Sequence, residues 1–297
     1  MAQEDWIRLD NGLLQAAVDP QGAQLSVLRD LSAGRDLLWH GDPAHWSGRA
    51  PILFPIVGSL NDGRYRQGGA IHSLPRHGFA RGRRFTVVAQ SAEAVRLRLA
   101  DDAETYTAYP FDFELDVEFH LDGPTLSCVA TVCNTGDAPL PASIGFHPAF
   151  RWPLPEGTPR TSQRIRFAEE EPSAIRRLDA DGLLRPEGFP SPVEGRVLKL
   201  DDALFAQDVL IFDQLRSRSL WYGAEHGDGI DIRFPDARYL GIWTKPGAPF
   251  LCIEPWRGVA DPAGYVGEFS AKPGIEMLEH LGDTLRLTMQ ISVRPLE

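Results

Sequence analysis

The fold of this chain is decided by residues 111–134, which read FDFELDVEFHLDGPTLSCVATVCN. Apolar side chains occupy every second position from Phe111 to Leu121, and acidic or polar side chains fill most of the positions between them. Period two is typical of a strand with one face in the core and the other in water. Turn residues follow at 122–124, and the alternation resumes at the even positions 126–132. The stretch therefore predicts a long antiparallel hairpin.

The same alternation recurs outward from this hairpin. It returns near the C-terminus from Leu285 to Val293, and again from Ile230 to Phe234. Only short helical turns are expected, one of them around Asp201–Ala206, because no window of a dozen residues keeps a helical apolar face free of Gly and Pro. Further strands are expected at Leu13–Val18, Gln24–Leu28, Phe85–Ala89, Val95–Leu99, Val209–Phe212, Tyr239–Thr244 and Leu251–Glu254.

Composition agrees with an all-β chain. Among the 297 residues are 28 Gly and 24 Pro, so turns are frequent and long helices are disfavoured. The segment Arg151–Pro192 is rich in Pro, Gly and charge, and it is interpreted as a long surface excursion rather than a linker between domains. The same alternation of apolar residues, typical of strands, is found on both sides of this segment. A single domain over residues 1–297 is therefore expected, with antiparallel sheets and no βαβ units.

Charge and cysteine content exclude several classes of protein. The 30 basic and 41 acidic side chains give a formal net charge of −11, which disfavours binding to nucleic acid. Residues 1–6 carry no leader pattern, and no apolar run is long enough to span a membrane, so a cytoplasmic protein is expected. The cysteines Cys128, Cys133 and Cys252 form no C-x-x-C pair and are expected to be buried thiols.

Chemistry is expected where titratable groups coincide with residues that bend the backbone. His77 precedes a glycine, and His147 and Glu254 each precede a proline, so all three are placed at strand ends. Strand ends that face one cavity are common ligand sites. Two histidines and one carboxylate are suitable for general acid–base catalysis near neutral pH.

Other kinds of site have weaker support. A metal site of cupin type built from His72, His77, His147 and Glu254 lacks both an H-x-H pair and an H-E-x-x-H motif. No G-x-S-x-G, Gly-rich nucleotide loop or reactive cysteine context is present, so no cofactor and no metal are predicted. Trp256 and Trp243 flank the Glu254 segment, and their flat faces suit a sugar ring.

Five motifs in this order resemble the aldose 1-epimerase, or galactose mutarotase-like, superfamily over nearly the whole chain, and its lactose-operon-type bacterial branch most closely. The motifs are Phe54–Gly58, His77–Arg81, Gly145–Pro148, Asp208–Phe212 and Ile253–Trp256. The resemblance implies a single antiparallel β-supersandwich. It also implies an isomerase that interconverts the α- and β-anomers of a hexose without a cofactor, acting as a monomer or homodimer.

The resemblance assigns roles to individual residues. Glu254 matches the family's general base, His147 its general acid and His77 its other active-site histidine. Asp208 matches an aspartate that binds a sugar hydroxyl. Glu254 would take the proton of the anomeric hydroxyl while His147 protonates the ring oxygen, so that the ring opens and closes again on the other face.

The substrate is left open between two classes of sugar. The segment His77–Arg81 is shared with hexose-6-phosphate 1-epimerases, and Arg49, Arg81 and Arg84 are candidates to bind a phosphate. The net negative charge favours a neutral aldose.

Two other functions also remain open. One is a non-catalytic sugar-binding module on the same scaffold. The other is a glycoside hydrolase that pairs Glu254 with Glu276 or Glu279.

Overall fold

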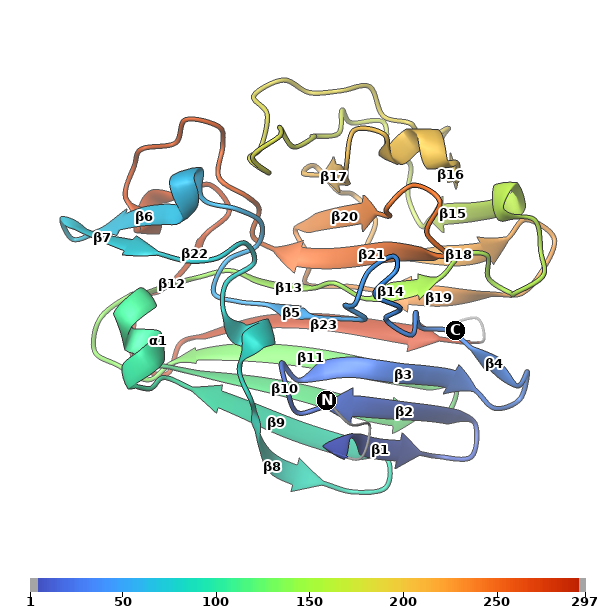
Figure 1. The fold of residues 1–297 in the computed structure, drawn as a ribbon, viewed down its shortest axis with the longest axis horizontal. Helices are drawn as coiled ribbons and strands as arrows, with labels where there is room; N and C mark the ends of the chain where they lie inside the picture. The colour runs from blue at the N-terminus through green and yellow to red at the C-terminus, as the bar shows by residue number, and fades with distance from the viewer. Residues whose placement is uncertain (1–4, 294–297) are drawn as a thin grey trace.

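The computed structural model describes residues 5–293. Residues 294–297 lie outside it, and so do residues 1–4, which belong to the N-terminal stretch that was searched for a leader pattern. Every strand pairing in the five sheets is antiparallel, which confirms the all-β prediction. The largest sheet has nine strands (Figure 1), which pair in the order β16 (Val197–Lys199), β15 (Gln163–Phe167), β18 (Ser219–Ala224), β19 (Gly229–Arg233), β23 (Thr284–Ser292), β11 (Thr125–Asn134), β10 (Phe113–Asp122), β9 (Ala94–Ala100) and β8 (Thr86–Gln90).

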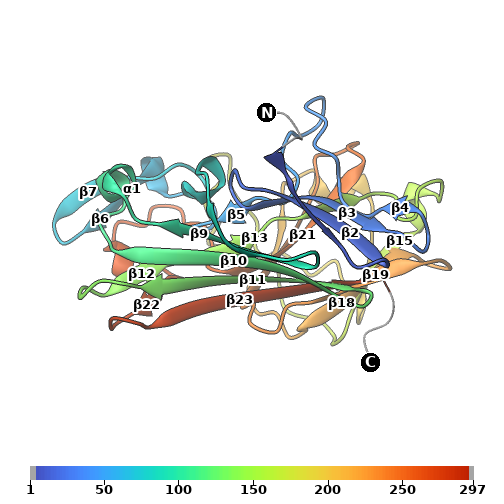
Figure 2. The ribbon, with the colours of Figure 1, turned by 90° about the horizontal axis from the view of Figure 1, so that it is seen from below.

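Other sheets cover this one (Figure 2). A four-stranded sheet contains β1 (Ile7–Asp10), β2 (Leu14–Asp19), β3 (Gln24–Asp30) and β4 (Arg35–Asp36). A six-stranded sheet contains β17 (Leu210–Phe212), β20 (Tyr239–Trp243), β21 (Phe250–Arg257), β13 (Ile144–Phe146), β5 (Ile52–Leu53) and β14 (Ala149–Arg151). Two small sheets pair β6 (Arg64–Gln67) with β7 (Ala70–Ser73), and β12 (Leu140–Ala142) with β22 (Glu276–Leu278).

The predicted hairpin forms the middle of the nine-stranded sheet. β10 and β11 pair over their whole length, from Phe113 opposite Asn134 to Asp122 opposite Thr125. Most of their apolar side chains lie on the buried face, as the alternation requires, and Val129 is on the outer face. These side chains belong to one buried cluster that extends from Ile7 to Ile291.

Helical structure is short, as predicted. The α-helix α1 (Ala103–Ala108) begins at Asp102, whose carboxylate accepts the backbone N–H groups of Glu104 and Thr105. The expected turn at Asp201–Ala206 is η5 (Asp202–Phe205), and the other 3₁₀ turns are η2 (Asn61–Gly63), η3 (Ala80–Gly82), η4 (Arg160–Ser162) and η6 (Phe269–Ala271). None of the helices in residues 5–293 is long and apolar enough to span a membrane.

The prediction for Arg151–Pro192 was wrong in one part. Residues Gln163–Phe167 of this segment form β15, which pairs with β16 and β18 inside the large sheet. Glu171, the last of three consecutive glutamates, is buried and accepts the backbone N–H groups of Arg216 and Ser217. The segment therefore contributes to the core as well as to the surface.

The cysteine prediction was right for two of three residues. All three thiols are free, and Cys128 and Cys252 are buried, whereas Cys133 is partly exposed. Cys133 lies on the outer face of β11, where alternate side chains point away from the core.

Trp256 of β21 fills space above two glycines on the neighbouring strands. Gly145 of β13 and Gly241 of β20 lie on opposite sides of β21 in the sheet. A Cβ atom would lie 2.7 Å from the indole at Gly145 and 2.3 Å from it at Gly241. The ring can lie flat across three strands only because both neighbours lack a side chain.

Candidate active site

Glu254, His147, His77 and Asp208 all line one cleft, as their predicted roles require. The cleft measures about 810 Å³, including the part that is open to solvent. It lies over the middle of the six-stranded sheet, where β21, the loop between β13 and β14, and the approach to β17 converge. Its remaining lining residues are Trp46, Val57, Gly58, Arg76, Arg81, Leu178, Val209, Ile211, Trp243, Trp256 and Ala260.

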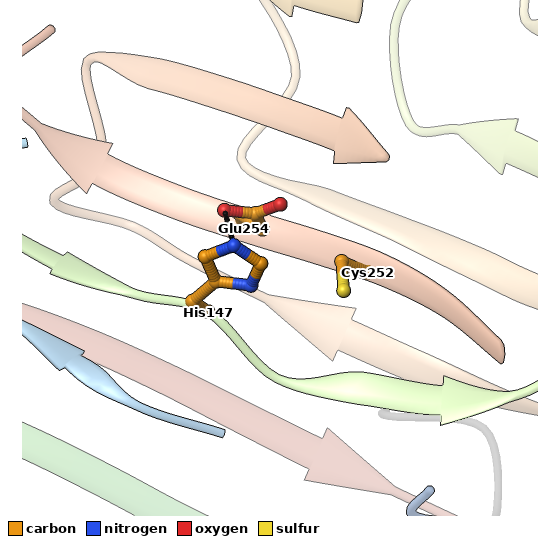
Figure 3. Close-up of side chains that lie close together, drawn as sticks. All are labelled: His147, Cys252 and Glu254. Carbon is orange, nitrogen blue, oxygen red and sulfur yellow. Dashed lines mark ion pairs between the residues drawn. The ribbon is translucent and has the colours of Figure 1, made fainter. Parts of the chain in front are cut away.

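Strand pairing brings His147 to Glu254. Ala149 of β14 pairs with Cys252 of β21, and the backbone N–H of Ile253 donates to the carbonyl of Pro148 at 3.2 Å. This register places His147 beside Glu254, and its Nε2 atom lies 3.2 Å from Glu254 Oε2 (Figure 3). Both residues are buried, with 8% and 1% of their surfaces exposed. A close pair of titratable groups therefore forms the floor of the cleft.

Burial shifts the proton affinities of this pair in opposite directions. Burial, aided by the positive charges of Arg76 and Arg81, lowers the pKa of His147 to about 3. Burial raises the pKa of Glu254 well above 4.5, Asp208 adds to the rise, and Arg76 opposes it. Both shifts favour the uncharged forms, a protonated Glu254 carboxyl beside a neutral His147 imidazole, so the pair then holds one proton between two groups 3.2 Å apart.

His77 is held by its backbone and by two donors. It adopts φ +67°, in the left-handed region, immediately before Gly78. The backbone N–H of Gly58 faces its Nδ1 at 3.1 Å, and Arg76 Nε faces its Nε2 at 3.3 Å. A neutral imidazole has one acceptor nitrogen, so His77 accepts a hydrogen bond from only one of these donors at a time. The imidazolium form has no acceptor and is disfavoured here, and burial, aided by the nearby charges, lowers the pKa of His77 well below 6.5. The ring of His77 lies 5.7 Å from that of His147.

Asp208 enters the cleft from a loop that Arg177 holds. Asp208 also has a left-handed backbone, with φ +64°. The guanidinium of Arg177 donates to the carbonyls of Asp208 at 2.7 Å and Leu204 at 2.8 Å. These bonds fix a backbone conformation that is unfavourable for a residue with a side chain. Neither the sequence pattern nor the family resemblance pointed to Arg177.

Arginine residues were the least well predicted group. Arg81 lines the cleft as expected, but Arg49 does not, because its guanidinium packs over the ring of Trp6. Arg84 faces Asp5, at 3.8 Å, and also lies outside the cleft. Arg76, which was not predicted, lines the cleft beside Arg81, and within residues 5–293 neither has a carboxylate within ion-pair distance. The only signal for Arg76 was its position next to His77.

Three tryptophans form the apolar walls of the cleft. Trp256 and Trp243 line it as predicted. Trp46, which the sequence did not single out, lines it too and lies 5.1 Å from the His147 ring. Flat apolar walls around buried polar groups are the arrangement that a sugar ring needs.

The four-residue metal set considered from the sequence does not assemble around the cleft. His72 lies on β7, stacked on Tyr65, and is not a lining residue. Among the described residues, the group with the spacing of metal ligands is His147, Cys252 and Glu254 (Figure 3), whose ligand atoms lie within 4.8 Å of one another.

Similarity to known proteins agrees with the geometry of the cleft. Residues 5–263 match the family model described as aldose 1-epimerase. The chromosomal LacX protein of Lactococcus lactis subsp. lactis is 32% identical over 302 residues, which cover 97% of this chain and 99% of LacX.

Two solved structures share the fold. The galactose mutarotase related enzyme from Lactobacillus acidophilus is 26% identical, with a TM-score of 0.88 and coverage of 98% of this chain and 97% of that one. The galactose mutarotase-like protein from Lactobacillus casei is 28% identical, also with a TM-score of 0.88, over 97% of this chain and 100% of that one. A family match that spans most of the chain, together with relatives aligned end to end, establishes that this chain belongs to the aldose 1-epimerase family.

Proposed function

We propose that this protein is an aldose 1-epimerase that interconverts the α- and β-anomers of a hexose by general acid–base catalysis. The observation that carries the proposal is the buried pair of Glu254 and His147, 3.2 Å apart at the floor of a cleft with apolar walls. Glu254 is the base, His147 the acid, and His77 a neutral hydrogen-bonding partner of the sugar.

The proton count of the pair matches the reaction. In the ion-pair form, Glu254 is a carboxylate and His147 an imidazolium. The carboxylate takes the proton of the anomeric hydroxyl, the imidazolium gives its proton to the ring oxygen, and the C1–O5 bond breaks to leave the aldehyde. The pair is then a neutral acid and a neutral imidazole, the form that burial favours. Rotation about C1–C2 and the reverse transfers close the ring on the other face.

The lining of the cleft supports a sugar as the ligand. Asp208 offers a carboxylate to hydroxyl groups, and Trp243 and Trp256 offer flat faces to the C–H side of the ring. A module that only bound the sugar would have no use for a buried pair of groups that share a proton. The hydrolase alternative has less support, because Glu276 is bonded to Arg257, and neither Glu276 nor Glu279 lines the cleft.

A phosphorylated hexose is a second candidate substrate. Arg76 and Arg81 are two guanidiniums at the cleft without a carboxylate partner in the described part of the chain. Guanidinium groups bind phosphate with two parallel hydrogen bonds, which a neutral C6 hydroxyl would not match. This local charge opposes the overall net charge of −11.

The test is anomer exchange measured by saturation-transfer NMR on α-glucose, α-galactose and glucose 6-phosphate. We expect acceleration over buffer for at least one sugar, and a fall of roughly 10²–10⁴-fold in the Glu254→Gln variant. A matched control is Glu279→Gln, at an exposed position away from the cleft, which should keep the full rate. Binding of these sugars without acceleration would favour the binding module, and full activity in Glu254→Gln would show that the base is misassigned.

A further inference from the structure

The floor of the cleft combines ligand types that soft divalent metals prefer. Cys252 and Glu254 lie two residues apart on β21, so their side chains project from the same face of the strand. His147 approaches that face from the loop after β13 (Figure 3). Imidazole, thiolate and carboxylate together form a ligand set of zinc type, and hard ions such as Mg²⁺ and Ca²⁺ require oxygen atoms instead.

The spacing is close to that of a bound ion. Zn–ligand bonds of about 2.0–2.3 Å place two ligands of a tetrahedral ion roughly 3.3–3.8 Å apart. The ligand atoms of His147, Cys252 and Glu254 already lie within 4.8 Å of one another, so side-chain movements of about 1 Å close the site. No backbone rearrangement is needed.

An unpartnered buried atom also points to this site. Nδ1 of His147 is buried and has no hydrogen-bond partner among residues 5–293. The ring is therefore not fixed by a protein acceptor on that side. In Figure 3 one ring nitrogen faces Glu254 and the other lies on the side of Cys252. A small rotation of the ring can thus present a nitrogen to an ion between the two.

Access and charge are also suitable. His147 and Glu254 line the cleft, so an ion can enter from it, and the fourth position stays open to water. The Cys252 thiolate and the Glu254 carboxylate supply two negative charges, which neutralise the dication. They also offset its repulsion by the positive charges of Arg76 and Arg81. Binding would release the thiol proton and the proton that Glu254 and His147 share. Nothing is oxidised or reduced.

We propose that His147, Cys252 and Glu254 form an inhibitory site for Zn²⁺ and similar soft divalent cations, which compete with the sugar for the proton-transfer pair. The inhibition rests on the proposed function, but the metal binding does not. Cys252 is the residue that distinguishes this site from a bare acid–base pair, since it lies behind the cleft and outside its lining.

The first experiment uses Co²⁺ as a probe, without any sugar. The wild-type protein should show a near-ultraviolet absorption band from thiolate-to-cobalt charge transfer, which added Zn²⁺ abolishes. The Cys252→Ser variant should lack the band, and the control Cys133→Ser, on the outer face of β11, should retain it. The wild-type result decides the test by itself, so the proposal stays falsifiable even if the Cys252→Ser protein is unstable. Absence of the band in wild type overturns the site, whatever the catalytic activity.

The second experiment measures anomer exchange against metal concentration. We expect Zn²⁺ and Cd²⁺ to inhibit wild type reversibly, with relief by a chelator, and Mg²⁺ to have no effect. Relative to its own rate without metal, Cys252→Ser should need at least about tenfold more Zn²⁺ for the same fractional inhibition. Equal zinc sensitivity in wild type and Cys252→Ser would refute the proposal. A cobalt band in a protein that accelerates no aldose would instead leave the site in place and reject the proposed function.

Discussion

The substitution Gly78→Ala tests whether the turn that carries His77 is as tightly constrained as its geometry indicates. Gly78 has φ +72°, and a Cβ atom there would lie 2.1 Å from the carbonyl oxygen of Phe54. That oxygen already accepts the backbone N–H groups of Phe79 and Ala80. Separating the two atoms to an ordinary contact of 3.4 Å requires a shift of about 1.3 Å in backbone that cannot easily move.

The expected cost has two parts. A left-handed backbone with a side chain costs about 1–2 kcal/mol, and forced overpacking costs about 1–3 kcal/mol. We therefore expect the free energy of unfolding to fall by roughly 2–5 kcal/mol, or about 4–10 °C in Tm at ~2 °C per kcal/mol for a chain of this length. A displacement of His77 by about 1 Å should also lower kcat/KM by roughly 10²-fold.

Denaturant unfolding and saturation-transfer NMR measure the two effects. Gly82→Ala is the matched control, because Gly82 lies four residues on, at the end of η3, with open space around its Cβ position and without a left-handed backbone. It should match the wild type in both assays. A Gly78→Ala protein as stable as the control would refute the account of the turn. Normal stability combined with lost activity would show that the constraint is functional rather than steric.

Three other predictions concern the proton-transfer pair and the loop that faces it. The kcat/KM for anomer exchange should stay level through neutral pH and fall as the pH rises past the raised pKa of Glu254, because the Glu254–His147 pair then loses its one proton. A fall in kcat/KM on the acid side near pH 6.5, the ordinary pKa of histidine, would contradict this. Glu254→Gln should melt at a higher temperature than wild type at pH 8 but not at pH 4. A buried carboxyl with a raised pKa lowers the free energy of unfolding as the pH rises above 4.5, by about 1.4 kcal/mol for each pH unit up to that raised pKa. Arg177→Met should raise KM by about tenfold at nearly unchanged kcat, and should add no further loss in an Asp208→Asn background if Arg177 acts by positioning Asp208.

The long strands were predictable because each obeys a simple periodicity. β10, β11 and β23 each have one buried face, and the alternation of their apolar residues shows which face of each strand is turned toward the core. β15 was missed although Ile165 and Phe167 alternate with arginines, because the prolines and glycines around it suggested a surface loop. Short strands in irregular surroundings have too few periods to be distinguished from loops.

The candidate site was predictable where a titratable residue lies next to a residue that bends the chain. His77, His147 and Glu254 satisfy that condition, and they all line the cleft. Arg49 was named only as a candidate to bind a phosphate, and its guanidinium packs over the ring of Trp6 instead. Arg76 was overlooked because the direction of a side chain in a loop depends on long-range contacts, which the local sequence does not encode.

Trp256 and the two glycines beneath it have a consequence for how this sequence can change over evolution. The indole occupies the volume that side chains at Gly145 and Gly241 would need, at 2.7 Å and 2.3 Å. A larger residue at either glycine is therefore harmful while the tryptophan is present, and it becomes tolerable once a smaller side chain replaces Trp256. The three positions form an epistatic unit, so relatives in which one of them differs should differ at another as well. Drift at the wall of the cleft must then proceed through paired substitutions rather than single steps.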